Sequence, residues 1–162
     1  MTIRRIALVA AAASSLAFLP ANTASAVTSA DLNSFDRQLI ADLNAARIER
    51  GIAPLNLSNR LTPIATGWSQ QLAAGQVLTN NPHIRAAVNS ACPAWRKLGE
   101  TVGEASGSTA DELFASFMSN ADDRHTVLNR KFTWVGVHGE PVVGDNGTTT
   151  MWSVLDFANH CS

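Results

Sequence analysis

The feature that most constrains the fold is a pair of strand-like segments in the last third of the chain. Residues 132–137 and 149–157 are rich in β-branched and aromatic side chains, which favour extended backbone. Between them, Gly144-Asp145-Asn146-Gly147 is typical of a tight turn. We therefore predict that the two segments pair as antiparallel neighbours in one sheet.

The second of these segments carries large apolar groups on both of its faces. Met151, Leu155 and Phe157 point one way, and Trp152 and Val154 point the other way, because side chains alternate along a strand. Both faces of the sheet must then be covered. Apolar spacing predicts helices over 34–50, 59–74 and 108–118, with a short helix or turn over 121–128. The result is an α+β protein, a three-layer α-β-α sandwich with a central antiparallel sheet.

Residues 75–107 show no long period of either kind and are predicted to be a long connecting region. They contain several glycines, two prolines, Cys92 and His83. Long ordered loops are common places for binding sites. Trp95, Leu98 and Val102 lie here beside the polar Glu100, and apolar walls with a few polar groups are what a ligand groove needs.

The first 26 residues have the three-part layout of a secretory signal. Met1-Thr2-Ile3-Arg4-Arg5 is positively charged, residues 6–19 are apolar apart from two serines, and Ala24-Ser25-Ala26 offers small residues to a signal peptidase. An apolar run of this length is short of the roughly 20 residues that a bilayer core needs. We predict secretion after cleavage near Ala26, in preference to a permanent anchor or the export route that twin arginines suggest. Residues 27–33 are then a flexible lead-in and residues 34–162 a single domain.

The charge of the predicted mature chain argues against several partners. Removing Arg4 and Arg5 from the 12 basic residues leaves 10 against 13 acidic residues, a net charge of −3 with histidine neutral. No basic run is longer than two residues, so binding to nucleic acid or to a membrane through a positive surface is not expected. No segment after residue 26 is apolar enough to cross a membrane.

The two cysteines, Cys92 and Cys161, are predicted to form a disulfide. An even number of cysteines in a secreted chain favours a bridge over free thiols. A zinc site built on the same two residues is the alternative, but no further ligand lies at metal spacing beside either one. The bridge would tie the C-terminal end to the middle of the chain.

Six short segments follow one another in a recognisable order. They are residues 44–55 (N-x-x-R-x-x-x-G-I-x-P-L), Leu61 with Ala65, Gly99-Glu100-Thr101, Phe117-Met118-Ser119, residues 123–128, and the paired strands with Trp134 to Val137 and Trp152 to Phe157. Together they resemble the CAP superfamily of cysteine-rich secretory, antigen 5 and pathogenesis-related proteins, in its bacterial SCP-domain form. The resemblance covers residues 35–157 and implies the same α-β-α sandwich that the residues predict.

The resemblance also implies a site. In this family two histidines and one or two acidic residues gather in a cleft, sometimes with zinc. His83 matches the first histidine and Glu100 the motif glutamate, while Asp123 stands where the second histidine belongs and His125 follows it. Thr101 replaces the family's asparagine. His83, Glu100 and Asp123 form a harder ligand set, which would favour a weaker or different divalent ion. We expect no required cofactor, with a divalent metal such as zinc or calcium as the possible ligand of this set.

Structural roles are the alternative for each of these side chains. Glu100 in a Gly-Glu-Thr segment is typical of a cap for backbone amides, and Asp123 complements the dipole of a helix start. Residues 123 and 125 of a helix point about 200° apart, so Asp123 and His125 cannot easily face one ion. His83 is then a loop residue.

The function that the resemblance favours is that of a secreted, non-enzymatic binding module. Its ligand would be a small apolar molecule such as a sterol or lipid, or an extracellular protein or cell-wall partner. The alternative is a divalent-metal-dependent hydrolase or protease that uses His83 and Glu100. The chain has no Gly-x-Ser-x-Gly motif and offers no evident catalytic nucleophile, so enzymatic activity is less favoured.

Overall fold

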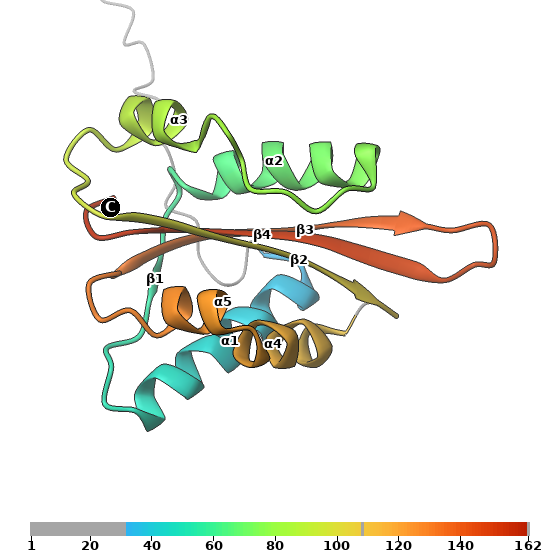
Figure 1. The fold of residues 1–162 in the computed structure, drawn as a ribbon, viewed down its shortest axis with the longest axis horizontal. Helices are drawn as coiled ribbons and strands as arrows, with labels where there is room; N and C mark the ends of the chain where they lie inside the picture. Colours follow the sequence, from blue (N-terminus) through green and yellow to red (C-terminus); the bar gives the residue numbers. More distant parts are fainter. Residues whose placement is uncertain (1–31, 108, 162) are drawn as a thin grey trace, which may run out of the picture.

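A four-stranded sheet lies between two layers of helices in the computed structural model, which describes residues 32–107 and 109–161 (Figure 1). The predicted signal sequence and residues 27–31 lie outside these ranges. In chain order the elements are α1 (Ser34–Glu49), β1 (Asn56–Leu57), α2 (Thr62–Gly75), α3 (Ile84–Ala91), β2 (Leu98–Ser106), α4 (Ala110–Ser119), α5 (Ala121–Val127), β3 (Trp134–Val143) and β4 (Thr149–Ala158).

The strands follow the order β1-β3-β4-β2. The predicted hairpin is confirmed: β3 and β4 pair antiparallel from Trp134 opposite Ala158 to Val143 opposite Thr149. On the other side of β4, β2 pairs antiparallel along its whole length. The short β1 adds a parallel edge beside the start of β3, so the sheet is mixed at that edge and antiparallel elsewhere.

Both faces of β4 are covered, as its side chains predict. Met151, Leu155 and Phe157 belong to one large core cluster with residues of α1, α4 and α5. Trp152 and Val154 belong to a smaller cluster on the opposite face with residues of α2. Figure 1 shows α2 and α3 on one side of the sheet and α1, α4 and α5 on the other. We refer to these sides as the α2/α3 face and the α1/α4/α5 face.

The ends of the first two helices follow from local chemistry. Asn33 caps α1, because its side chain accepts a hydrogen bond from the backbone N–H of Asp36. Gly51 takes the left-handed conformation after this helix, with φ of 63°. Pro63 lies in the first turn of α2, as predicted. The left-handed residue that ends α2 is Gln76 rather than Gly75.

The prediction of a long connecting region over 75–107 is wrong, because this range contains α3 and β2. The strand has no apolar alternation since its α1/α4/α5 face carries small residues. A Cβ at Gly103 would approach the side chain of Leu113 to 2.5 Å, and one at Gly99 would approach Phe132 to 2.7 Å. Large helix and loop side chains therefore fill the space that β2 leaves open.

Two links join distant parts of the chain. The predicted disulfide between Cys92 and Cys161 is confirmed, with 5.1 Å between the two Cα atoms, and it ties the end of α3 to the C-terminal segment. Arg47 is fully buried at the end of α1. Its guanidinium donates to the backbone oxygens of Ala53 and three later residues, Val127, Asn129 and Phe132.

Candidate functional site

A cavity of about 170 Å³ opens between β2 and the segment that joins α2 to α3. Its apolar walls are Ile84 and Leu98, and its polar walls include Glu100 and Arg85. Two asparagines, Asn80 and Asn81, complete the rim. The cavity combines apolar surface with a few polar groups, which is the composition of small-ligand sites.

Glu100 fastens the rim of this cavity to the sheet. Its Oε1 atom accepts hydrogen bonds from the backbone N–H of Asn81 at 2.7 Å and from the side-chain amide of Asn80 at 2.9 Å. The predicted structural role of this glutamate, as a cap for backbone amides, is therefore present. The second oxygen, Oε2, is buried, and no described residue donates to it.

Asp156 stands directly opposite Glu100 on the neighbouring strand β4. Asp156 is fully buried, and no described residue donates a hydrogen bond to either of its oxygens. Burial, followed by the charge of Glu100, raises the pKa of Asp156 well above its usual range. Burial also raises the pKa of Glu100, although its hydrogen bonds from Asn81 and Asn80 oppose this shift. Two carboxyl groups in this position can hydrogen-bond to each other only when one keeps its proton, and the deeper burial of Asp156 favours the proton on that residue.

The start of α2 explains why Asp156 cannot reach solvent. Gly136 is the partner of Asp156 on β3. A Cβ at Gly136 would lie 2.3 Å from the carbonyl carbon of Leu61 and 2.4 Å from the nitrogen of Thr62. The backbone at the start of α2 thus presses on the sheet beside Asp156.

The structure separates the residues that the family resemblance groups together. His83 is exposed at the start of α3, and its backbone N–H donates to Asn81 at 2.9 Å, so it lies on the same face of the sheet as Glu100. Asp123 and His125 belong to α5 on the other face. A Cβ built on Gly99 would point at Thr126 of α5. Because side chains alternate along a strand, the next residue, Glu100, points to the opposite face, away from α5.

This separation bears on the metal that the family implies. Among the described residues, no group of three or more histidine, cysteine, aspartate or glutamate side chains is placed to hold a metal ion. Burial, and then the charge of Asp122, raises the pKa of Asp123. The set His83, Glu100 and Asp123 does not fit a metal in this fold, so we derive no chemical step through one.

The three residues predicted to line an apolar groove have different surroundings. Leu98 lines the cavity beside Glu100. Trp95 is not part of this lining, but its ring lies under the guanidinium of Arg85, a lining residue, at 5.7 Å, and its indole N–H donates to Asn89. Val102 packs in the cluster that contains Trp152.

A second group of titratable side chains, which the sequence patterns did not predict, lies at the open edge of β3. The two ring nitrogens of His138 lie 3.7 Å from the carboxylate of Asp36 and 3.1 Å from that of Glu140. Burial raises the pKa of Asp36 to about 6, although His138, the N–H of Gly139 and Asn33 oppose the shift. The sequence feature that could have revealed this group and Asp156 is a charged residue inside an otherwise apolar strand.

Comparisons with known proteins agree with the fold. The family model described as CAP, cysteine-rich secretory protein family, matches residues 40–155. Among curated proteins none matches the sequence. An outer surface protein from Borrelia burgdorferi has 12% identity and a TM-score of 0.65, over 79% of this chain and 94% of that one.

Two other solved structures are longer than this chain. An extracellular protein containing an SCP domain, from Bacillus anthracis, is 17% identical with a TM-score of 0.64, over 79% of this chain and 41% of that one. A cysteine-rich secretory protein from Staphylococcus aureus is 21% identical with a TM-score of 0.60, over 77% of this chain and 38% of that one. In the part of the chain that the structure describes, none of the helices has the length and hydropathy of a membrane span.

Proposed function

The chain belongs to the CAP, or cysteine-rich secretory protein, family, and we propose that it is an extracellular, non-enzymatic binding module for a small apolar ligand with one polar group, such as a sterol or another lipid with a hydroxyl group. The observation that carries this proposal is the buried carboxyl pair beside a partly apolar cavity. Ile84 and Leu98 provide the apolar walls, and Glu100 with Asp156 provides a polar end.

The size of the cavity limits what enters it. A volume of about 170 Å³ holds only a few water molecules, each of which occupies about 30 Å³. The hydroxyl end of a sterol fits this space, whereas its apolar body does not. The body would extend over Leu98 toward Trp95, whose ring lies next to Arg85 at the cavity wall.

Secretion is part of the same proposal. The layout of residues 1–26 supports it, and the names of the similar structures, an outer surface protein, an extracellular protein and a secretory protein, agree with it. Mass spectrometry of the protein from culture medium should find an N-terminus at Val27. A product that keeps residues 1–26 would overturn this part.

Tryptophan fluorescence tests the ligand. We expect cholesterol, whose hydroxyl can donate to Glu100, to quench the fluorescence in a saturable way, and Glu100→Gln to weaken the binding about tenfold, the usual cost of losing a hydrogen bond to a charged group. Glu104→Gln is the matched control, because Glu104 is an exposed glutamate on the same face of the same strand. No saturable quenching, or equal effects of both variants, would refute the proposal.

A metal-dependent hydrolase or protease remains the alternative from the sequence, as does binding to an extracellular protein or a cell-wall partner. The hydrolase requires His83 and Glu100 to share an ion. Metal analysis of protein purified without a His tag, with zinc titration of His83→Ala, distinguishes the hydrolase from the non-enzymatic binding module. Zinc that co-purifies, and whose affinity falls in the variant, would favour the hydrolase.

A further inference from the structure

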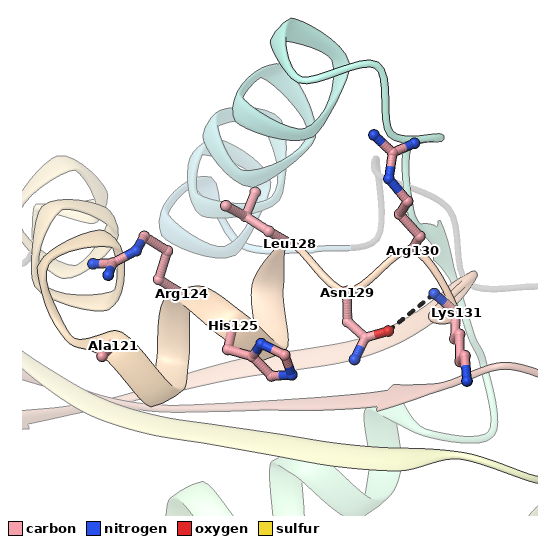
Figure 2. A pocket seen from close by; sticks show the side chains of 7 residues that line it. All are labelled: Ala121, Arg124, His125, Leu128, Asn129, Arg130 and Lys131. Atoms are coloured by element: carbon pink, nitrogen blue, oxygen red, sulfur yellow. Dashed lines mark hydrogen bonds between the residues drawn. The ribbon is translucent and has the colours of Figure 1, made fainter.

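A second cleft, of about 550 Å³, lies on the α1/α4/α5 face around the end of α5 (Figure 2). Its lining includes Arg124, His125, Arg130 and Lys131. None of the described residues that line it is acidic. The cavity at Glu100 and two other hollows of the described chain do have acidic lining residues, Asp111 in one and Asp42 with Glu49 in the other. The hollow at the disulfide also lacks acidic side chains, but Arg60 is its one lysine or arginine among the described residues.

The positive charge of this cleft is unusual for an acidic chain. Residues 27–162 have a net charge of −3 with histidine neutral. Among the described residues, the ion pairs found do not involve Arg124, Arg130 or Lys131. Three permanent cations therefore surround one cleft without acidic partners, which makes it attractive to anions.

Both arginines are held in place by the ends of helices. Arg130 donates to the backbone oxygens of Gly51 at 2.9 Å and Arg50 at 3.2 Å, just after α1. Arg124 donates to the oxygen of Met118 at 2.8 Å at the end of α4. A guanidinium that is already fixed loses little further freedom when an anion binds, so these contacts prepare the cleft for a ligand.

The directions of the side chains indicate the kind of anion. Figure 2 shows Arg124 and Arg130 extending to different sides of the cleft, with His125 and Asn129 between them and Lys131 beside Asn129. One planar carboxylate cannot face all of these groups. A chain of linked phosphates presents charge in several directions, and guanidinium and ammonium groups both bind phosphate well.

We propose that this cleft binds a ligand with several linked phosphate groups. The site is separate from the cavity at Glu100, which lies on the other face of the sheet, so the proposal does not depend on the proposed function. The phosphates can come from a soluble polymer or from the headgroups of an anionic lipid surface, because the cations recognise the same group in both.

Titration of the purified protein with tripolyphosphate at low ionic strength tests the site. We expect saturable binding that weakens about tenfold in Lys131→Gln, the usual effect of removing one charge-assisted hydrogen bond. Lys131 is exposed and its side chain anchors no helix, so its loss should leave the fold intact. The control is Arg96→Gln, since Arg96 is also exposed and uses its backbone N–H to contact Asn159.

Three results would overturn the proposal: no saturable binding, an equal loss in the Arg96→Gln control, or no loss in Lys131→Gln. A second arm identifies the source of the phosphate. If the protein is retained on phosphatidylglycerol vesicles but not on phosphatidylcholine vesicles, and tripolyphosphate releases it, the site is supported and lipid headgroups are the source of the phosphate. Binding of tripolyphosphate without retention on either vesicle supports the site with a soluble phosphate chain as the source.

Discussion

On the α1/α4/α5 face of the sheet, one continuous cluster of buried apolar residues joins three helices to the strands. On the α2/α3 face the apolar residues divide into two smaller clusters. The division falls at the carboxyl pair: along β4, Val154 belongs to one cluster, Asp156 carries a carboxyl group, and Ala158 belongs to the other.

This difference indicates that one face contributes more to folding stability and the other is suited to binding. Burial of apolar surface is the main source of folding free energy, and the α1/α4/α5 face has the larger continuous share. On the α2/α3 face, the carboxyl groups of Glu100 and Asp156 interrupt the apolar contact, and the disulfide belongs to one of the two clusters. Polar groups that weaken a core are typical of places where a protein binds a ligand.

The largest expected effect comes from Arg47, which joins the end of α1 to the segments before and after α5. In Arg47→Met, the buried backbone oxygens that the guanidinium satisfies lose their donors. Loss of a buried charged donor of this kind costs about 3–5 kcal/mol. Urea unfolding should measure this loss.

Arg60 provides the control on the other face. It is exposed and donates to the oxygen of Ala91 at 3.0 Å. Arg60→Met should cost less than about 1 kcal/mol. Similar losses in the two variants would mean that the two faces do not differ in the way we describe.

The disulfide should matter next, and mainly for the α2/α3 face. Its cysteines are 69 positions apart, and closing a loop of that length stabilises a protein by about 2–4 kcal/mol. The double variant Cys92→Ser, Cys161→Ser should lose this amount. Hydrogen exchange should become faster in α3 while α1 and α4 stay protected, and uniform acceleration would contradict the comparison.

Two glycines test how closely each helix layer approaches the sheet. Gly136→Ala would push against backbone atoms of α2, which cannot move alone, so we expect a loss of about 1–3 kcal/mol. Gly103→Ala would meet the ends of the Leu113 and Phe117 side chains, which can adjust their rotamers, and should cost less. Thermal unfolding of both variants gives the order, and the reverse order would show that the α1/α4/α5 face is the more rigid one.

The sequence allowed the covered sheet, the hairpin, the disulfide and the family to be predicted because each leaves a strong local pattern. Trp152 and Val154 point to one face of the sheet, and Leu155 and Phe157 point to the other, so helices must cover both faces. Strand β2 was missed for the opposite reason. Its inward positions are Gly99, Gly103 and other small residues, so the apolar signal lies on the residues packed against it rather than on the strand itself.

The candidate site was predicted only in part. Glu100 was found through its motif, but its partner Asp156 lies 56 positions later, and only the register of β2 with β4 brings the two together. Asp123 and His125 were grouped with Glu100 by the resemblance, although spacing along the chain cannot tell which face of a sheet a helix covers. The fold places α5 on the opposite face from the Glu100 side chain.

The smallest expected effect concerns the pH dependence of the α2/α3 face. Because the folded-state pKa of Asp156 is raised, the folded protein holds this proton more tightly than the unfolded chain does. The stability from this group is present below the ordinary aspartate pKa near 4 and is lost as the pH rises toward the raised value. An asparagine side chain at this position is neutral at every pH and can still donate to Glu100, so Asp156→Asn should be more stable than the parent at pH 7, by about 1 kcal/mol.

Urea unfolding from pH 4 to pH 8 checks this, with Asp145→Asn in the exposed turn between β3 and β4 as the control. The stability of the parent and of the control should fall together over this range, while Asp156→Asn should show a flatter profile. A variant whose profile stays parallel to that of the parent would mean that the carboxyl pair holds no extra proton. In that case the break between the two apolar clusters would be a gap in packing rather than a place where the protein keeps a proton beside its cavity.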